Sequence, residues 1–182
     1  MSERASPRVV IDACVLASHR ICDLILRLAE EPGLYEPKWS DEIIGETVRT
    51  LEHKLNWPVS LVGYFESQLR ASFSQAWVYN QKNWTPLMTN DPKDRHVTAT
   101  AVACDASLIV TFNLRHFRLT DLEKWNVVAV HPQRFLMDLF HRDPDAVRLK
   151  VQEQATEGCR SLANHLNALR SMIPEFVALI ES

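Results

Sequence analysis

Apolar residues occur along this chain in two alternating patterns, short continuous runs and longer stretches with apolar positions three or four residues apart. The short runs predict buried strands, which cover residues 8–11, 33–36, 107–111 and 126–130. The longer stretches predict helices, which cover residues 14–31, 40–55, 58–73, 91–103 and 132–140. Strands that alternate with helices indicate an α/β fold with a parallel sheet covered on both faces. The segment 74–90 is aromatic and polar, and no element is assigned to it.

The residues from 143 onward are helical and more polar, with two apolar stripes. The stripes consist of Leu162, Leu166 and Leu169, and of Phe176, Val177 and Ile180. We therefore expect a main domain over residues 1–140 and a C-terminal helical extension over residues 141–182. Either the extension simply packs on the main domain, or it offers a surface for a partner or for self-association.

Composition narrows the function classes only in part. The chain has 182 residues, of which 46% are hydrophobic, and a formal net charge of -3. Only four glycines are present, so a Gly-rich phosphate loop of a P-loop or dinucleotide-binding fold is not expected. No apolar run approaches the roughly 18 residues that cross a bilayer, and the polar N-terminus does not resemble a signal peptide. The four cysteines form no C-x-x-C pair and predict buried, reduced thiols in a cytoplasmic protein.

Three acidic residues stand out as candidate metal ligands. Asp12 follows the first strand, Glu46 lies off the apolar stripe of its helix, and Asp94 lies in the first turn of another helix. Each has an ordinary explanation alone, as a helix cap, a solvated acid or a partner of the helix dipole. In parallel sheets, however, ligands bind outside the carboxyl ends of strands, and a cluster of acids implies a metal ion or a shared proton. Sequence spacing leaves open whether the three converge.

Four blocks of the chain carry a resemblance to a known family. Residues 10–16 look like an opening strand, 40–46 match S-x-E-I-x-x-E, 91–97 match D-P-x-D-R-H-V, and 111–117 resemble T-x-N-x-x-D-F. In this order, over about residues 8–140, the blocks resemble those of PIN-domain ribonucleases, in particular the VapC-type toxins of bacterial toxin–antitoxin pairs.

This resemblance implies a three-layer fold with a parallel sheet of about five strands between helices. It also implies a metal-dependent endoribonuclease that cleaves single-stranded RNA with Mg²⁺ or Mn²⁺, held by Asp12, Glu46 and Asp94. Thr111 and Asn113 would position a water or the substrate. VapC-type members are usually held inactive by an antitoxin whose segment enters the site, so the expected partners are RNA and an antitoxin. Whether the chain forms a homodimer stays open.

One residue departs from the family pattern, because His116 stands where the family commonly has Asp. An imidazole brings no negative charge to a Mg²⁺ site, although it can bind Mn²⁺ or contact phosphate. We therefore keep His116 in the catalytic set and keep a second hypothesis, a degenerate PIN domain that binds RNA or a protein without cleaving. A phosphatase with Asp12 as nucleophile is disfavoured, since position 14 is Cys where that pattern needs a second Asp.

Two further groups of residues are candidates for RNA contact. Basic residues near the motifs either contact phosphates or are ordinary solvated charges. They are Lys93, Arg95, His96, Arg115, His116 and Arg118. Of these, Arg95 and Arg115 are the expected substrate-binding residues. Aromatic residues in the unassigned segment either stack unpaired bases or pack in the core; they are Trp77, Tyr79 and Trp84.

Overall fold

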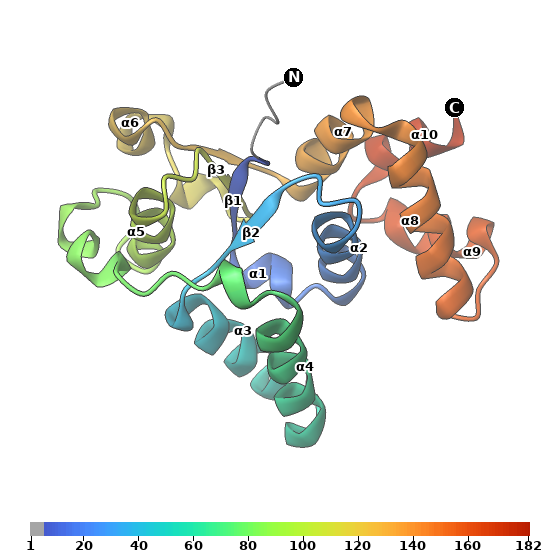
Figure 1. Ribbon diagram of the computed structural model, residues 1–182, viewed down its shortest axis with the longest axis horizontal. Coiled ribbons are helices and arrows are strands. Elements are labelled where there is room, and N and C mark those ends of the chain that lie inside the picture. Colours follow the sequence, from blue (N-terminus) through green and yellow to red (C-terminus); the bar gives the residue numbers. More distant parts are fainter. Residues whose placement is uncertain (1–5) are drawn as a thin grey trace.

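A parallel sheet with helices on both faces forms the centre of the molecule, in a computed structural model that describes residues 6–182 (Figure 1). Its strands are β1 (Arg8–Ile11), β2 (Glu36–Lys38), β3 (Leu108–Val110) and β4 (Val128–Val130), in the order β2-β1-β3-β4. Figure 1 shows α2 and α7 on one side of the sheet and α5 on the other. The predicted α/β fold is confirmed.

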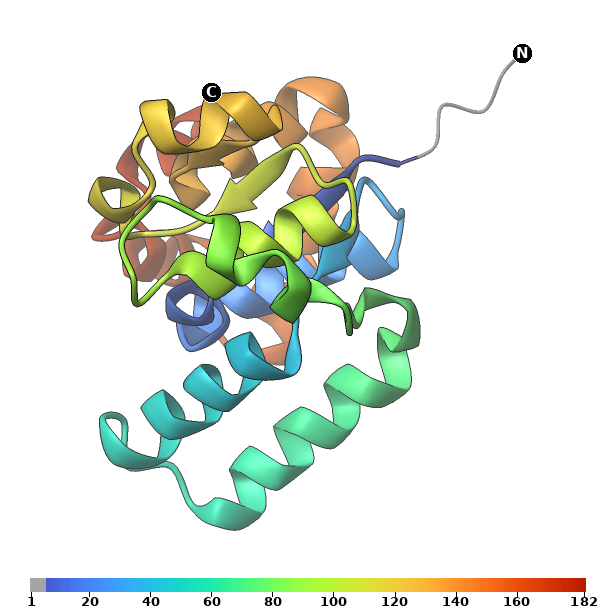
Figure 2. The same ribbon diagram turned by 90° about the vertical axis from the view of Figure 1, so that its left-hand side faces the viewer.

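Ten α-helices are present in the part of the chain that the structure describes. They are α1 (Ala13–Leu16), α2 (His19–Glu30), α3 (Asp41–His53), α4 (Val59–Ser72), α5 (Arg95–Ala103), α6 (Leu119–Leu122), α7 (Pro132–Arg142), α8 (Pro144–Glu157), α9 (Leu162–Arg170) and α10 (Pro174–Glu181). Short 3-10 helices cover Ser74–Ala76, Gln81–Asn83, Thr85–Leu87, Leu114–His116 and Glu123–Trp125. Figure 2 shows that α3 and α4 run side by side and project away from the sheet.

The sheet has four strands among the described residues, where the sequence led us to expect about five. Beyond β2, only a single parallel bridge between Trp39 and Trp77 continues the sheet. The bridge cannot extend because Ser40 directly follows Trp39 and caps α3, its side chain accepting a hydrogen bond from the Ile43 N–H. Because α3 begins here, no extended residues remain after Trp39 with which a fifth strand could pair.

Two predicted helix boundaries are wrong for local reasons. The helix expected over residues 14–31 is divided into α1 and α2, because the backbone of Ser18 leaves the helical region. The helix expected from Asp91 begins at Arg95 instead. The residues before it form a turn, in which the Asp94 N–H donates to the Asp91 carbonyl at 2.9 Å and the Lys93 N–H donates to Asp91 Oδ1 at 3.0 Å. Asp94, and not Asp91, thus occupies the N-cap position of α5.

The C-terminal helices share one hydrophobic core with the sheet. Helix α8 packs against α2 and α7, and α10 packs against α7 and α9. Val151 and Phe176 are fully buried in the same cluster as Ile11 and Ile109. The extension therefore packs on the main domain, while the division of the chain after residue 140 stays a prediction.

Two other expectations concern single residues and single helices. All four cysteines are free, but Cys159 is exposed rather than buried, because it lies in the turn between α8 and α9. None of the described helices has the length and apolar character needed to cross a membrane.

A buried histidine ties α9 to α8. The amide nitrogen of Gln154 donates to the Arg20 carbonyl at 2.9 Å and to Asp23 at 2.7 Å, so Gln154 Oε1 accepts from His165 Nε2 at 2.9 Å. Burial, with the positive charges of Arg160 and Arg20, lowers the pKa of His165 below its ordinary value of 6.5. The fold therefore favours the neutral imidazole.

We predict that His165 makes the fold less stable in acid. Because the folded chain binds fewer protons at His165 than the unfolded chain does, its contribution is complete above pH 6.5 and is lost as the pH falls through the lower folded pKa. Urea denaturation of the wild type and of His165→Gln, between about pH 8 and about pH 5.5, should show a smaller loss of unfolding free energy in the variant. The exposed His141→Gln is the control, and equal losses in all three proteins would contradict the prediction.

Candidate active site

The five residues predicted to be catalytic line one cavity of about 760 Å³. They are Asp12, Glu46, Asp94, Asn113 and His116. The cavity lies beyond the carboxyl ends of β1 and β3, where parallel sheets bind ligands. Residues from four separate parts of the chain thus meet at the place that the topology favours.

Asp12 is held by its neighbours in the sheet and not by a helix. It is the N-cap residue of α1, yet its side chain makes no capping hydrogen bond. Instead Thr111 Oγ1 donates to Asp12 Oδ2 at 2.6 Å, and Cys14 Sγ donates to the same oxygen at 3.1 Å. The carboxyl group is only 2% exposed. A capping role therefore does not explain Asp12, which instead forms part of the cavity wall.

Cys14 acts as a hydrogen-bond donor beside this acid. Burial, together with the negative charge of Asp12, raises the pKa of its thiol to about 12. The thiol is therefore protonated at neutral pH and is a poor nucleophile.

Asp94 shows the same departure from ordinary capping. It is the N-cap residue of α5 and makes no side-chain cap, while its Oδ2 lies 2.6 Å from His116 Nδ1. Burial raises the pKa of Asp94, the charges of Asp12 and Glu46 raise it further, and the bond to His116 opposes them. Since a carboxylate responds to like charges nearby, this shift reports that the three acids share one electrostatic environment.

The hydrogen bonds of His116 assign its protonation. Arg115 Nε donates to His116 Nε2 at 3.1 Å, so that nitrogen must carry the lone pair. The proton is therefore on Nδ1, which donates to Asp94. The imidazole fixes the Asp94 carboxylate and adds no negative charge. Asp91 lies nearby, and the ligand atoms of Asp91, Asp94 and His116 all lie within 4.8 Å of one another.

Glu46 comes to the cavity on one face of α3. Its Oε2 lies 3.4 Å from His96 Nε2, and this imidazole nitrogen makes no well-formed hydrogen bond. Burial alone would lower the pKa of His96, but the neighbouring Glu46, helped by Glu42 and Asp12, outweighs it and raises that pKa. Glu46 therefore lies beside an imidazole whose protonated form it favours.

Sequence reasoning missed the cations on this face of α3 and just after it. Arg49 and His53 line the cavity three and seven residues after Glu46, and Lys54 follows them. These spacings put Arg49 and His53 on the helix face of Glu46, so helical periodicity counted from Glu46 would have found them. Together with Lys93, they place positive charge around the acids.

The other residues predicted to bind substrate differ in whether they reach the acidic cavity. Thr111 is fully buried and donates to Asp12, so it positions that acid, while its expected contact with substrate stays a prediction. Arg95 donates to the Asn90 carbonyl at 3.2 Å and does not line the acidic cavity. Arg115 is exposed and covers His116.

The donor set fits a divalent cation. Three carboxylates, two of them buried, offer the oxygen ligands that Mg²⁺ and Mn²⁺ prefer, and an imidazole beside them is acceptable to Mn²⁺. A cation would also relieve the mutual repulsion that contributes to the raised pKa of Asp94. The residues that would hold it are Asp12, Glu46 and Asp94.

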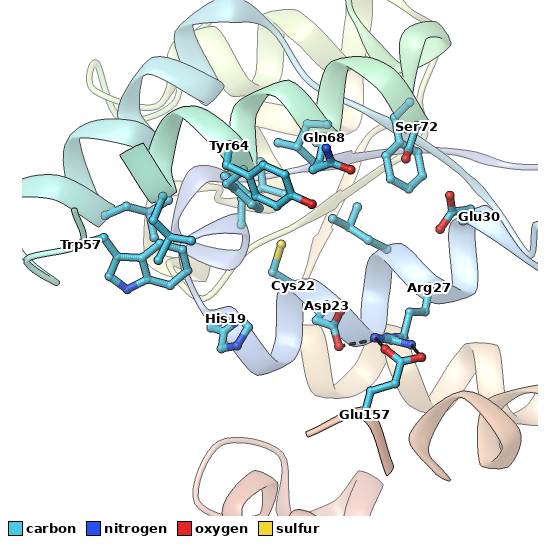
Figure 3. Close-up of a pocket in the computed structure, with 17 residues that line it drawn as sticks. His19, Cys22, Asp23, Arg27, Glu30, Trp57, Tyr64, Gln68, Ser72 and Glu157 are labelled. Carbon is cyan, nitrogen blue, oxygen red and sulfur yellow. Dashed lines mark hydrogen bonds and ion pairs between the residues drawn. The ribbon is translucent and has the colours of Figure 1, made fainter. Parts of the chain in front are cut away.

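A second cavity, of about 530 Å³, lies between α2 and α4 and has a different character (Figure 3). Its walls include Trp57 and Tyr64, while its charged rim is internally paired: Arg27 donates to Asp23 at 3.0 Å and to Glu157 at 3.1 Å. Acids neutralised by an arginine do not need a cation. This apolar cavity therefore does not compete with the acidic one as a hydrolytic centre.

Comparison with known proteins identifies a family and a relative of this chain. The family model described as "PIN domain" matches residues 8–115, which contain Asp12, Glu46 and Asp94 and end just before His116. The chain is 34% identical over 106 residues to "Putative ribonuclease VapC50" of Mycobacterium tuberculosis (strain ATCC 25618 / H37Rv). The aligned part covers 57% of this chain and 63% of that relative, so the chain spans less than two thirds of the relative's length. No solved structure matches.

We predict that Thr111→Val destabilises the protein by about 1.5–3 kcal/mol, because it removes a donor from a buried charged oxygen. The change also leaves the Asn113 N–H, which donates to Thr111 Oγ1 at 3.0 Å, without its partner. Urea denaturation measures the loss. Thr111→Ser keeps the hydroxyl and should recover most of the stability; if it is as unstable as Thr111→Val, packing and not hydrogen bonding governs this position.

Proposed function

Since the chain belongs to the PIN domain family, we propose that it is an endoribonuclease that hydrolyses phosphodiester bonds of single-stranded RNA. The observation that carries the proposal is the meeting of Asp12, Glu46 and Asp94 in one cavity at the strand ends. Asp12 and Asp94 occupy N-cap positions but make no capping hydrogen bond, so helix capping does not account for their carboxylates. Similarity to a relative named as a ribonuclease supports the same reaction.

We propose that the acids hold Mg²⁺ or Mn²⁺ while the surrounding cations hold RNA. A bound divalent ion would supply an activated water and stabilise charge on the phosphodiester. Thr111 orients Asp12 through its hydrogen bond, and His116 does the same for Asp94. Lys93, Lys54 and Arg49 lie where phosphate oxygens would enter, and Asn113 offers an amide to the substrate or to a water.

We also propose that the protein is the toxin of a toxin–antitoxin pair acting in the cytoplasm. The resemblance to VapC-type proteins supports this role, and so does the 34% identity to VapC50. An antitoxin segment that enters the acidic cavity would inhibit cleavage by occupying the space of RNA and metal. A basic side chain on that segment would satisfy the three acids in place of the cation.

We predict that Asp94→Asn lowers RNA cleavage by at least about a hundredfold without unfolding the protein, because it removes a ligand charge. Labelled single-stranded RNA, incubated with Mg²⁺, Mn²⁺ or EDTA, gives the measurement, and circular dichroism checks the fold. Asp138→Asn makes the same chemical change on α7, where Asp138 pairs with Arg134 at 2.9 Å, and should leave cleavage unchanged.

Metal-dependent cleavage that is lost in Asp94→Asn supports the nuclease. Well-folded, antitoxin-free protein that cleaves nothing with either metal overturns it. The degenerate domain that binds RNA or protein would then be the better description, for which the donor role of His116 is the specific support.

We predict that His116→Asp raises cleavage with Mg²⁺ relative to Mn²⁺. The carboxylate adds a negative oxygen ligand beside Asp94, which Mg²⁺ prefers, and it removes an imidazole that favours Mn²⁺. Initial rates with each metal, measured in parallel for the wild type and the variant, give the ratio. An unchanged ratio would mean that residue 116 does not influence the choice of metal.

A further inference from the structure

A third cavity, of about 470 Å³, adjoins the acidic one along α3. Glu46 and Arg49 line both cavities. Its far wall is the segment after α4, which contributes Tyr79, Gln81 and Lys82. The volume falls within the roughly 300–1,000 Å³ of typical small-ligand pockets. A ligand in this cavity would therefore be a direct neighbour of the proposed cleavage site.

Tyr79 offers an open aromatic face at this cavity. Of the three aromatic residues that the sequence marks in this segment, Trp77 is 9% exposed and Trp84 packs edge-on against Trp125 at 6.0 Å. Tyr79 is instead 71% exposed. An exposed aromatic ring beside a cavity is a platform on which an unpaired base can stack.

Gln81 is a buried amide without a sufficient partner. The residue is 3% exposed and lines the cavity, yet its Oε1 has no hydrogen-bond partner. An unsatisfied buried amide is costly, and native proteins keep few of them. A ligand that donates an N–H would satisfy this acceptor if the amide turned toward the cavity.

Acidic residues outnumber lysine and arginine around the cavity, three to two, since Arg49 and Lys82 line it as well. Asp41 and Glu42, from the first turn of α3, line it together with Glu46. Asp41 is paired with Arg70 at 3.4 Å, which leaves Glu42 as an additional acceptor. Carboxylates repel phosphate but accept hydrogen bonds from the amino groups of bases.

Arg49 connects the two cavities. Its guanidinium lies next to Gly45, with Nη1 in ordinary van der Waals range of the Cβ position there. The guanidinium thus lies along α3 at the boundary between the acids and the third cavity. A phosphate that joins two nucleotides would meet Arg49 as the chain passes from one cavity to the other.

We propose that this third cavity is a subsite for an unpaired nucleobase with an exocyclic amino group, adjoining the cleavage site. The base stacks on Tyr79 and donates its amino group to Gln81, with Glu42 as a second acceptor, while its phosphate contacts Arg49. The proposal rests on the proposed function, because it takes single-stranded RNA to be the substrate.

The test measures binding rather than cleavage. Full-length Asp94→Asn protein is titrated into fluorescent oligo(C) and oligo(U), and anisotropy gives the affinities. These two bases have similar stacking surfaces, but only cytosine has an amino group, so oligo(C) should bind more tightly. When Tyr79→Leu is added to the Asp94→Asn protein, RNA binding should weaken about tenfold, whereas added Tyr79→Phe should leave it unchanged. Tyr64→Leu is the matched control, since Tyr64 is 62% exposed on α4 beside the apolar cavity.

A second variant separates recognition from folding. Gln81→Met keeps the volume and removes the unpaired amide, so thermal stability should hold or rise while the preference for oligo(C) disappears. If the Asp94→Asn parent binds no RNA at all, the proposed function fails together with the subsite. If the parent binds RNA and neither Tyr79→Leu nor Gln81→Met changes the affinities, the subsite alone is overturned.

Discussion

Parallel pairing between β1 and β3 is the constraint on which the site depends. The register sets Ile11 beside Val110, and the Asp12 N–H continues the ladder by donating to the Val110 carbonyl at 3.1 Å. This pairing brings Asp12 next to Thr111 although they are 99 residues apart in the sequence. Since α1 starts after Asp12 and the 111–117 block starts after β3, the same pairing also brings His116, and through it Asp94, to the cavity. A shift of one residue in this register would separate the acids.

The acid cluster is tolerated because each of its two buried carboxylates, Asp12 and Asp94, has a hydrogen-bond partner. Buried charge is costly unless it is paired or hydrogen-bonded. Thr111 serves Asp12, His116 serves Asp94, and His96 lies beside Glu46. The imidazole at position 116 therefore makes sense in physical terms: a fourth carboxylate there would increase the repulsion, whereas a neutral donor reduces it. Having histidine in place of aspartate at position 116 also weakens the attraction of the site for a hard cation. The residue that stabilises the metal-free protein therefore lowers its affinity for the metal.

The sequence predicted β1, β3 and β4 near their observed positions because short apolar runs report burial in a sheet directly, whereas β2 was expected over residues 33–36 and covers Glu36–Lys38. The sequence also singled out the three acids, by their positions in the predicted elements and by the family resemblance, and their role as ligands stays a prediction. It missed Arg49 and His53 because a charged residue on an exposed helix face has the same pattern whether it is solvated or faces a ligand. It placed the start of α5 too early because Asp91-Pro92 fits a cap equally well; the competing turn, closed by the Asp94 N–H, is a three-dimensional outcome. The sequence marked Tyr79 as a candidate for base stacking but assigned no structure to its segment, because short 3-10 helices have no hydrophobic periodicity to detect.

Helix α3 would allow a protein with net charge -3 to bind RNA as we propose. The helix is the shared wall of two polar cavities, with Glu46 and Arg49 bordering both. Acids are concentrated where a cation or base amino groups would bind, and cations surround the acidic cavity where phosphates would pass. Since screening limits each charge to a range of about 8–10 Å, this local order matters more to a bound strand than the total charge. An extended single strand can follow such a surface, with its backbone near Arg49 and its bases turned inward, whereas a duplex cannot turn its bases out in this way.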